Sequence, residues 1–186
     1  MEKNDKYRDA PYTNLKSFTA KIEGSAKHHG YSGPLGSVQY GLRFLKNFYL
    51  NILANFVPYY GIRIALHRFR GVSIGKNVFI GYNVTIDNTY PELVTIEEGV
   101  AISGNNLILT HSKPLEYHKK ELKSYVAPVV IKKNAWITVG VTILPGVTIG
   151  EGSIIAAGSV VTDDIADNCL AAGNPAKMIK MFEDKN

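Results

Sequence analysis

Cysteine is nearly absent from this chain, since Cys169 is the only one among 186 residues. A single cysteine cannot form a disulfide within the chain, which excludes a disulfide-stapled secreted fold and indicates a reducing compartment. The first thirty residues are polar and have no apolar segment of the kind found in signal peptides. These two shortages lead us to expect a cytoplasmic protein.

Long apolar runs and a strong charge of one sign are also missing. The most apolar stretch, residues 40–56, is too short and too polar for a membrane span, because two basic residues and three asparagines interrupt it. The formal net charge of +5 is modest. It is compatible with a phosphate-bearing ligand, although many cytoplasmic proteins are as basic. No motif of a nucleic-acid-binding fold accompanies it, so we expect no nucleic-acid partner.

What the chain does have is an aliphatic residue at every sixth position. One register runs from Ile131 to Val161, and two shorter registers run over residues 74–86 and 96–108. A second series of small or β-branched residues lies two positions ahead, with Gly, Asn and Pro between the two. A short strand followed by a tight corner has this period, whereas an α-helix or a long strand does not. A meander of hairpins would not keep the spacing, so the sequence predicts a stacked solenoid.

Three motifs within the repeats carry a resemblance to a known family. They are Ile143-Leu-Pro-Gly-Val-Thr-Ile-Gly150, Ala157-Gly-Ser-Val-Val-Thr162 and Ala172-Gly-Asn-Pro-Ala-Lys177. With the rest of residues 72–180, they resemble the hexapeptide-repeat acyltransferases, and among these the maltose, galactoside and polysaccharide O-acetyltransferases. The resemblance implies an all-β solenoid, a left-handed parallel β-helix of about four coils. It also implies an N-terminal helical cap and a short C-terminal extension. The left hand comes from the family and not from the spacing.

We expect four segments along the chain. An N-terminal arm over residues 1–37 is loosely ordered or becomes ordered against a neighbouring subunit. A helical cap over residues 38–70 holds one helix at 40–56 and a shorter one at 62–69. The β-helix over residues 71–172 ejects a loop at 109–128, and a tail over 173–186 follows.

The first helix of the cap has an apolar stripe, and two roles for it remain open. We expect the stripe to close the open end of the solenoid, because a terminal coil exposes a cross-section of the core. The alternative is a weak contact with a membrane surface, since the apolar helix is followed by a basic segment. The stripe consists of Leu42, Leu45, Tyr49, Ile52, Leu53 and Phe56.

Two insertions interrupt the six-residue period, and loops on a rigid scaffold often carry function. His111 opens the longer insertion, and an imidazole titrates near neutrality, which suits a general base. In the family, a histidine at this place takes the proton from an acceptor hydroxyl or amine, and His118 is our second candidate for that role. Asp87 and Asn88 lie at the shorter insertion, where they either bind acceptor hydroxyls or form a turn. The aromatic residues that could stack on a sugar are Tyr82, Tyr90 and Tyr117.

The resemblance also implies a binding wall for acetyl-coenzyme A. In the family the pantetheine arm lies between two subunits of a homotrimer, along small residues at successive corners. In this chain these positions, together with an aromatic residue expected near the loop and two basic residues after the last coil, are Trp136, Thr138, Val139, Gly140, Ala156, Ala157, Thr162, Lys177 and Lys180. The chain departs from the family's pattern at Thr138, where glycine is common, and at Asp163, where a basic residue is frequent. The second departure weakens the expected binding of the cofactor phosphates.

The resulting hypothesis is an acetyl-CoA-dependent O-acetyltransferase that requires no metal and acts on a sugar or polysaccharide-precursor hydroxyl. An N-acyltransferase or serine acetyltransferase of the same fold, and a non-catalytic scaffold, remain as alternatives. A zinc hydratase needs three converging histidines, whereas the repeats and their loop hold two. Cys169 is expected to be a small buried residue and not a nucleophile.

Overall fold

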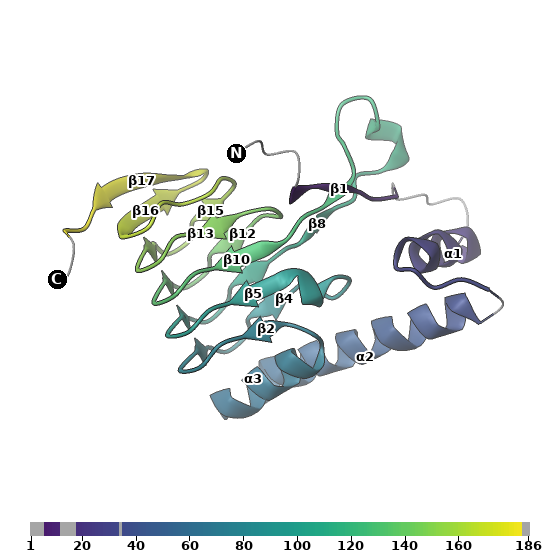
Figure 1. The fold of residues 1–186 in the computed structure, drawn as a ribbon, viewed down its shortest axis with the longest axis horizontal. Helices are drawn as coiled ribbons and strands as arrows, with labels where there is room; N and C mark the ends of the chain where they lie inside the picture. Colours follow the sequence, from purple (N-terminus) through teal and green to yellow (C-terminus); the bar gives the residue numbers. More distant parts are fainter. Residues whose placement is uncertain (1–5, 12–17, 34, 184–186) are drawn as a thin grey trace.

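A three-sided solenoid of short strands dominates the computed structural model, which describes residues 6–11, 18–33 and 35–183 (Figure 1). Side 1 consists of β2 (Ser73–Ile74), β5 (Val94–Ile96), β10 (Val129–Ile131) and β13 (Thr148–Ile149). Side 2 consists of β3 (Phe79–Ile80), β6 (Ala101–Ile102), β11 (Trp136–Ile137), β14 (Ile154–Ile155), β16 (Cys169–Gly173) and β17 (Ala176–Met181). Side 3 consists of β4 (Thr85–Ile86), β7 (Leu107–Ile108), β12 (Thr142–Ile143) and β15 (Val160–Val161).

The chain passes from side 1 to side 2 to side 3 in each of the four complete coils within the described residues. Neighbouring coils pair in parallel, and β17 alone on side 2 runs antiparallel, against β16. The predicted solenoid of about four coils is therefore confirmed. The tail contains a longer strand than expected, since β17 folds back over the last coil.

The six-residue register forms the core. Parallel pairing aligns Ile131 with Ile96 on one side and with Ile149 on the other. Burial of such a side chain contributes about 1.5–3 kcal/mol, so the register is the main source of stability in the solenoid. Ten of its isoleucines are at most 1% exposed: Ile80, Ile86, Ile96, Ile102, Ile108, Ile131, Ile137, Ile143, Ile149 and Ile155.

The corners repeat with the same period. The backbone dihedral φ is positive at Asn134, Gly140, Gly146, Gly152 and Gly158, which are spaced six residues apart. Glycine and asparagine tolerate this left-handed conformation better than other residues. The turn residues seen in the sequence thus mark the corners correctly.

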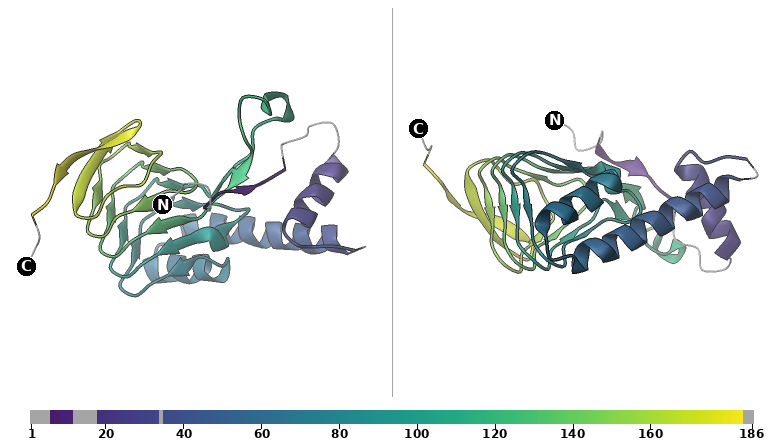
Figure 2. Two further views of the ribbon diagram at one scale, coloured as in Figure 1. Left: turned by 45° about the horizontal axis from the view of Figure 1, so that its top comes forward. Right: turned by 90° about the horizontal axis from the view of Figure 1, so that it is seen from below.

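Two helices, α2 (Gly36–Phe56) and α3 (Tyr60–Phe69), cover the first coil (Figure 2). Both begin before their predicted starts, α2 by four residues and α3 by two. In later coils, each core isoleucine carbonyl accepts a hydrogen bond from the coil before it, as Ile96 does from Gly75 N at 2.8 Å. The first coil has no preceding coil, so its carbonyl groups need other donors.

Three arginines supply those donors, one for each side of the solenoid. Arg68 donates to the Ile74 carbonyl at 2.9 Å, Arg63 to that of Ile80 at 2.9 Å, and Arg70 to that of Ile86 at 2.7 Å. Arg63 and Arg70 are each 3% exposed. The cap therefore satisfies the open edges of the sheets with charged hydrogen bonds.

The expectation that the apolar stripe of the first helix closes the solenoid was wrong. The buried residues of α2 are Gly36, Asn47, Asn51 and Ala54. The residues of the stripe point away from the solenoid and are between 38% and 79% exposed. Because the first coil exposes carbonyl groups as well as apolar side chains, polar residues make the better lid.

The N-terminal arm is better ordered than expected where it is described. Helix α1 (Phe18–His28) packs against α2, and β1 (Arg8–Asp9) pairs antiparallel with β9 (Tyr125–Val126). Strand β9 also pairs with β8 (His111–Ser112), so the ejected loop forms a small sheet with the arm of its own chain. The short 3-10 helices η2 (Pro91–Leu93) and η3 (Glu116–His118) lie in the two insertions. Among the described residues, no helix is both long and apolar enough to cross a membrane.

Candidate active site

Both insertions leave the solenoid at the corner that follows side 3, which we call the loop corner. Strands β4 and β7 are paired neighbours on side 3, with Ile86 in register with Ile108. Asp87 follows the first strand, and its N–H donates to the Ile108 carbonyl at 2.9 Å. Because the two insertions start one coil apart at the same corner, residues 24 positions apart in the sequence come together.

A carboxylate–imidazole pair results at this corner. His111 Nδ1 lies 2.6 Å from Asp87 Oδ2, and the Asp87 side chain is completely buried while that of His111 is 26% exposed. Three backbone N–H groups also donate to the carboxylate: Thr89 and Tyr90 to Oδ1 at 2.7 and 3.1 Å, and Thr110 to Oδ2 at 3.0 Å. Both carboxylate oxygens are therefore occupied by groups of the protein.

The electrostatics of Asp87 fix the tautomer of His111. Burial favours the neutral carboxyl, but the hydrogen bonds from His111, Thr110 and Tyr90 outweigh it and lower the pKa of Asp87 to about 2. An ionised carboxylate only accepts hydrogen bonds, so Nδ1 of His111 carries a proton toward Asp87. In the neutral ring, Nε2 is then free to accept a proton.

Asp87 was expected among the acceptor-binding residues, and the structure instead places it behind His111. With four donors around two buried oxygens, its carboxylate has no exposed edge for a sugar hydroxyl. Asn88 is likewise held from within, since its Oδ1 accepts from Arg70 at 2.7 Å and its carbonyl accepts from Asn47 Nδ2 at 3.2 Å. The shorter insertion is thus bound to the helical cap.

An aromatic cluster flanks the pair on the side of the arm. The ring of Tyr90 lies edge-on to His111 at 5.7 Å and stacks on His29 at 4.4 Å. Lys113 Nζ lies 5.0 Å from the centre of the Tyr90 ring. Burial raises the pKa of Tyr90 and lowers that of His29, so both rings are neutral near pH 7. His29 could not be found from the sequence, because the arm carries no pattern that places it here.

The proposed wall of small residues lies at a different corner, between side 2 and side 3. Turns at residues 138–140 and 156–158 stack there, with the Gly158 N–H donating to the Val139 carbonyl at 3.0 Å. Tyr82 lies at this corner too, in the first coil, and its hydroxyl donates to the Pro58 carbonyl at 3.2 Å. Within one chain, the small-residue corner and His111 are separated by the width of side 3. Thr138, Val139, Gly140, Ala156 and Ala157 form this column.

Thr162 does not belong to that column, contrary to the expectation. It follows β15 at the loop corner, six residues beyond Ala156, and its hydroxyl donates to Asp163 at 2.9 Å. Lys177 Nζ lies 3.7 Å from the same carboxylate. Asp163 therefore neutralises part of the charge that was expected to bind phosphate.

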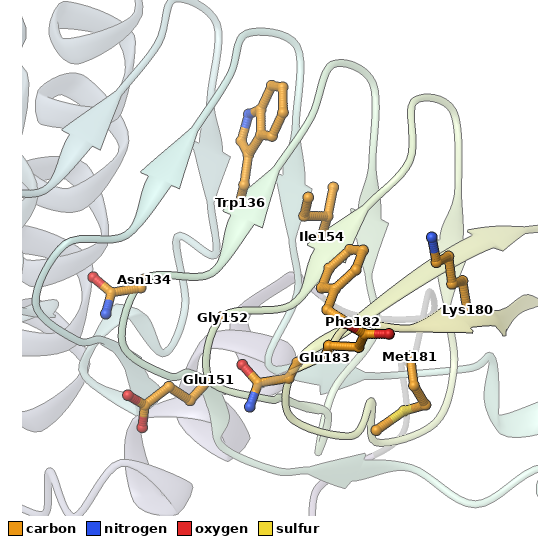
Figure 3. A pocket seen from close by; sticks show the side chains of 10 residues that line it. Asn134, Trp136, Glu151, Gly152, Ile154, Lys180, Met181, Phe182 and Glu183 are labelled. Atoms are coloured by element: carbon orange, nitrogen blue, oxygen red, sulfur yellow. The ribbon is translucent and has the colours of Figure 1, made fainter. Parts of the chain in front are cut away.

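Trp136 and Lys180 line a cavity of about 960 Å³ on the outer face of side 2 (Figure 3). Trp136 is 47% exposed, pairs through its strand with Ile154, and donates to Ser103 Oγ at 3.3 Å. Within one chain Trp136 is not near the loop, because side 2 is opposite the loop corner, and its expected packing near a loop of another subunit stays a prediction. Phe182 adds a second ring to the cavity.

The described side chains at the tip of the ejected loop are exposed. Tyr117 is 86% exposed and packs edge-on against His118, at 5.0 Å, a contact that does not include Asp87. Of the two histidines in the loop, His111 is therefore the one that the fold orients. Among the residues that the structure describes, no group of three or more His, Cys, Asp or Glu side chains could hold a metal.

Comparison with known proteins agrees with this architecture. A family model described as bacterial transferase hexapeptide (six repeats) matches residues 128–163. The galactoside O-acetyltransferase of Escherichia coli (strain K12) is 39% identical over 116 residues, 62% of this chain and 56% of that protein. The chain spans 55–60% of the length of the first curated relatives that it matches.

Two solved structures match over most of their length. The hexapeptide-repeat-containing acetyltransferase of Vibrio cholerae O1 biovar eltor, complexed with acetyl-coenzyme A, is 26% identical with a TM-score of 0.66, over 82% of this chain and 94% of that one. The maltose O-acetyltransferase of Clostridium difficile 630 is 30% identical with a TM-score of 0.63, over 78% of this chain and 89% of that one. The predicted left-handed parallel β-helix with N-terminal helices is confirmed. This chain belongs to the family of hexapeptide-repeat acetyltransferases.

Proposed function

We propose that this chain is an acetyl-CoA-dependent O-acetyltransferase that acetylates a hydroxyl of a sugar or polysaccharide precursor. The observation that carries the proposal is the pair of His111 and Asp87 at 2.6 Å, held where two loops leave a rigid solenoid. The named activities of the galactoside and maltose O-acetyltransferases support the choice of acceptor. The complex of the Vibrio cholerae protein supports acetyl-coenzyme A as the donor.

The chemistry follows from the orientation of His111. Because Asp87 holds the proton on Nδ1, Nε2 faces the acceptor as a general base. A hydroxyl is too weakly acidic to ionise beforehand, so His111 removes its proton as the oxygen attacks the acetyl thioester. The buried carboxylate stabilises the imidazolium that forms, and His111 then returns the proton to the departing sulfur. Correct placement of the two substrates supplies much of the remaining rate.

The residues proposed to bind the donor, acetyl-coenzyme A, are compatible with a site between subunits. The small-residue corner offers a close approach for an extended pantetheine arm, and Lys180 adds a cation at the cavity on side 2. Neither lies beside His111 of the same chain. We therefore propose a homotrimer in which His111 of one subunit meets the small-residue corner of the next, as the family resemblance implies.

Release of free thiol from acetyl-coenzyme A tests the function. The acceptor panel contains mono- and disaccharides, amino sugars and serine, so that an N-acyltransferase or a serine acetyltransferase is also detected. We expect His111→Ala to lower turnover with a sugar by roughly two to four orders of magnitude, with the dissociation constant of acetyl-coenzyme A nearly unchanged.

The second histidine of the loop provides the matched variant. His118→Ala removes an imidazole of the same loop that has no carboxylate partner among the residues that the structure describes, so its turnover should stay close to wild type. Retained turnover in His111→Ala would reject the assigned base, and its loss in His118→Ala alone would transfer the role to His118. Cofactor binding without release for any acceptor of this panel would leave two readings, a large or lipid-linked glycan acceptor outside the panel and a scaffold that binds without catalysing.

A further inference from the structure

The outward surface of the helical cap is covered with large apolar side chains. They extend over α2, the turn after it and α3, and each is between 38% and 79% exposed. We call this surface the α2–α3 apolar face. Its residues are Val38, Leu42, Leu45, Phe48, Tyr49, Ile52, Leu53, Phe56, Tyr59, Tyr60, Ile62 and Phe69.

The polarity of α2 is the reverse of that of an ordinary surface helix. Val38, Leu42, Leu45, Tyr49 and Phe56 recur at steps of three, four or seven residues, so they form one stripe. The opposite side of the helix is the buried one, and it carries asparagine, alanine and glycine. The polar side of α2 already caps the solenoid. The stripe therefore cannot be buried by turning the helix over, because that would remove the cap. A contiguous apolar patch of this size on a folded domain marks a contact surface.

The charges around the face indicate what covers it. No Asp or Glu occurs between Glu23 and Asp87. Lys46 and Arg68 are exposed at the flanks, Lys46 with its Nζ 5.3 Å from the centre of the Phe69 ring and Arg68 with its guanidinium hydrogen-bonded to the Ile74 and Gly75 carbonyls. An apolar surface with a basic rim complements an anionic lipid bilayer, in which the apolar residues enter the acyl boundary and the basic ones meet the headgroups.

Tyrosine within the face supports the same occupant. Tyr49, Tyr59 and Tyr60 are 55–71% exposed. Their rings are apolar and their hydroxyls polar, which suits the headgroup region of a bilayer. A second copy of the chain fits less well, because two such faces would bring the same basic residues together, and Glu92, an acidic residue beside α2, is already paired with Arg43 at 2.7 Å.

We propose that the α2–α3 apolar face docks on an anionic lipid bilayer. Helices α2 and α3 lie across the first-coil end, with the solenoid on one side of them (Figures 1 and 2). The α2–α3 apolar face is on the opposite side. Helix α2 stays attached to the solenoid during docking, because Asn47 and Arg70 bind residues 87–88 beside His111. The site is thereby placed next to the membrane. Resting on the proposed function, this position makes the acceptor a glycan carried by a lipid.

Co-sedimentation of the full chain with vesicles tests the docking. One set contains phosphatidylglycerol with phosphatidylcholine, and the other contains phosphatidylcholine alone. We expect binding to the anionic set that weakens with salt. The double variant Leu42→Gln/Phe56→Gln replaces side chains that are 63% and 79% exposed, and should bind at least about tenfold more weakly. The control Ile179→Gln, also at a 63% exposed position but on β17, should bind as wild type does.

The outcomes separate the docking from the activity. Thermal unfolding of the double variant should match that of wild type, because the replaced residues are exposed. Absence of wild-type binding to the anionic vesicles, or equal binding by the double variant, overturns the proposal. A smaller oligomer in the double variant without vesicle binding assigns the face to a second copy and overturns it as well. Vesicle binding without thiol release, when the vesicles also carry a lipid-linked glycan as acceptor, leaves the docking intact and removes the proposed function, whereas thiol release with a soluble sugar but no vesicle binding does the reverse.

Discussion

At the scale of single residues, burial decides what each polar side chain of the site can do. Asp87 and His111 both lie at the loop corner, but only the His111 side chain is partly exposed to solvent. The sequence indicated a catalytic role for His111 and left Asp87 open between acceptor binding and a turn, although each residue opens an insertion. It could not assign their roles, since whether a carboxylate faces the acceptor or the histidine depends on which backbone N–H groups surround it.

Replacement of Asp87 tests its role behind His111. Asp87→Asn keeps a hydrogen-bond acceptor for Nδ1 but removes the charge that stabilises the imidazolium, so kcat should fall by roughly ten- to a thousandfold. The KM for acetyl-coenzyme A should stay within about twofold, because Asp87 touches no proposed donor residue. Asp167→Asn, an exposed carboxylate at another corner, serves as the control. A raised KM for the acceptor with unchanged kcat would instead return Asp87 to the acceptor site.

His67 gives the stability of the protein a pH dependence. Its ring is 1% exposed and accepts a hydrogen bond from Arg70 at 2.9 Å. Burial, with the nearby Arg70 and Arg63, lowers the pKa of His67 from 6.5 to about 3. The unfolded chain therefore binds a proton that the folded chain does not, and stability falls as the pH drops below 6.5. Between pH 6.5 and 5 the free energy of unfolding should decrease by on the order of 2 kcal/mol.

Denaturant unfolding at several pH values measures this slope. His67→Gln keeps a hydrogen-bond acceptor but does not titrate, so it should reduce the slope in this range, and what remains includes the contribution of His29, whose pKa is also lowered by burial. Asp87 does not interfere, because its lowered pKa places the loss of its contribution below about pH 4. The same slope in both proteins would show that His67 is not the group responsible.

At the scale of the elements, local repetition explains what the sequence predicts well. Each strand buries an aliphatic residue against the coils before and after it, so the six-residue period alone determines strands, corners and coil number. The orientation of α2 has no such local signature. A stripe of apolar residues normally faces a core, and only the unpaired carbonyl groups of the first coil reveal why the polar side faces inward here.

Loss of one arginine cap should weaken that end of the solenoid. Arg63 is buried between the Ile80 carbonyl, the Val57 carbonyl at 2.7 Å, and the ring of Tyr82 at 4.3 Å. Arg63→Met keeps much of the side-chain volume but leaves the buried Ile80 carbonyl and the part-buried Val57 carbonyl without this donor, which should lower the free energy of unfolding by about 2–3 kcal/mol. Lys133→Met, at an exposed corner, should change it by less than about 0.5 kcal/mol. An equal effect of both variants in denaturant unfolding would contradict the capping role.

At the scale of the whole molecule, the proposed site divides between two corners. His111 lies at the loop corner, and the column from Tyr82 to Ala157 lies at the small-residue corner. The spacing already separates Thr162 from the small-residue corner. Thr162 is 24 residues beyond Thr138, which is one coil of 18 residues plus one further side of six. The position of Trp136 relative to the loop could not be deduced in this way, since it depends on how subunits meet.

Mixing two inactive variants tests whether the site lies between subunits. His111→Ala removes the base, and Ala157→Trp blocks the small-residue corner at an exposed position. In a trimer with sites between neighbours, some interfaces combine an intact His111 with an intact corner from the other variant. Co-expression of the two with different tags should therefore restore about one quarter of the wild-type sites, as random assembly gives. If each chain holds a complete site, the mixed trimers stay as inactive as the two variants assayed separately.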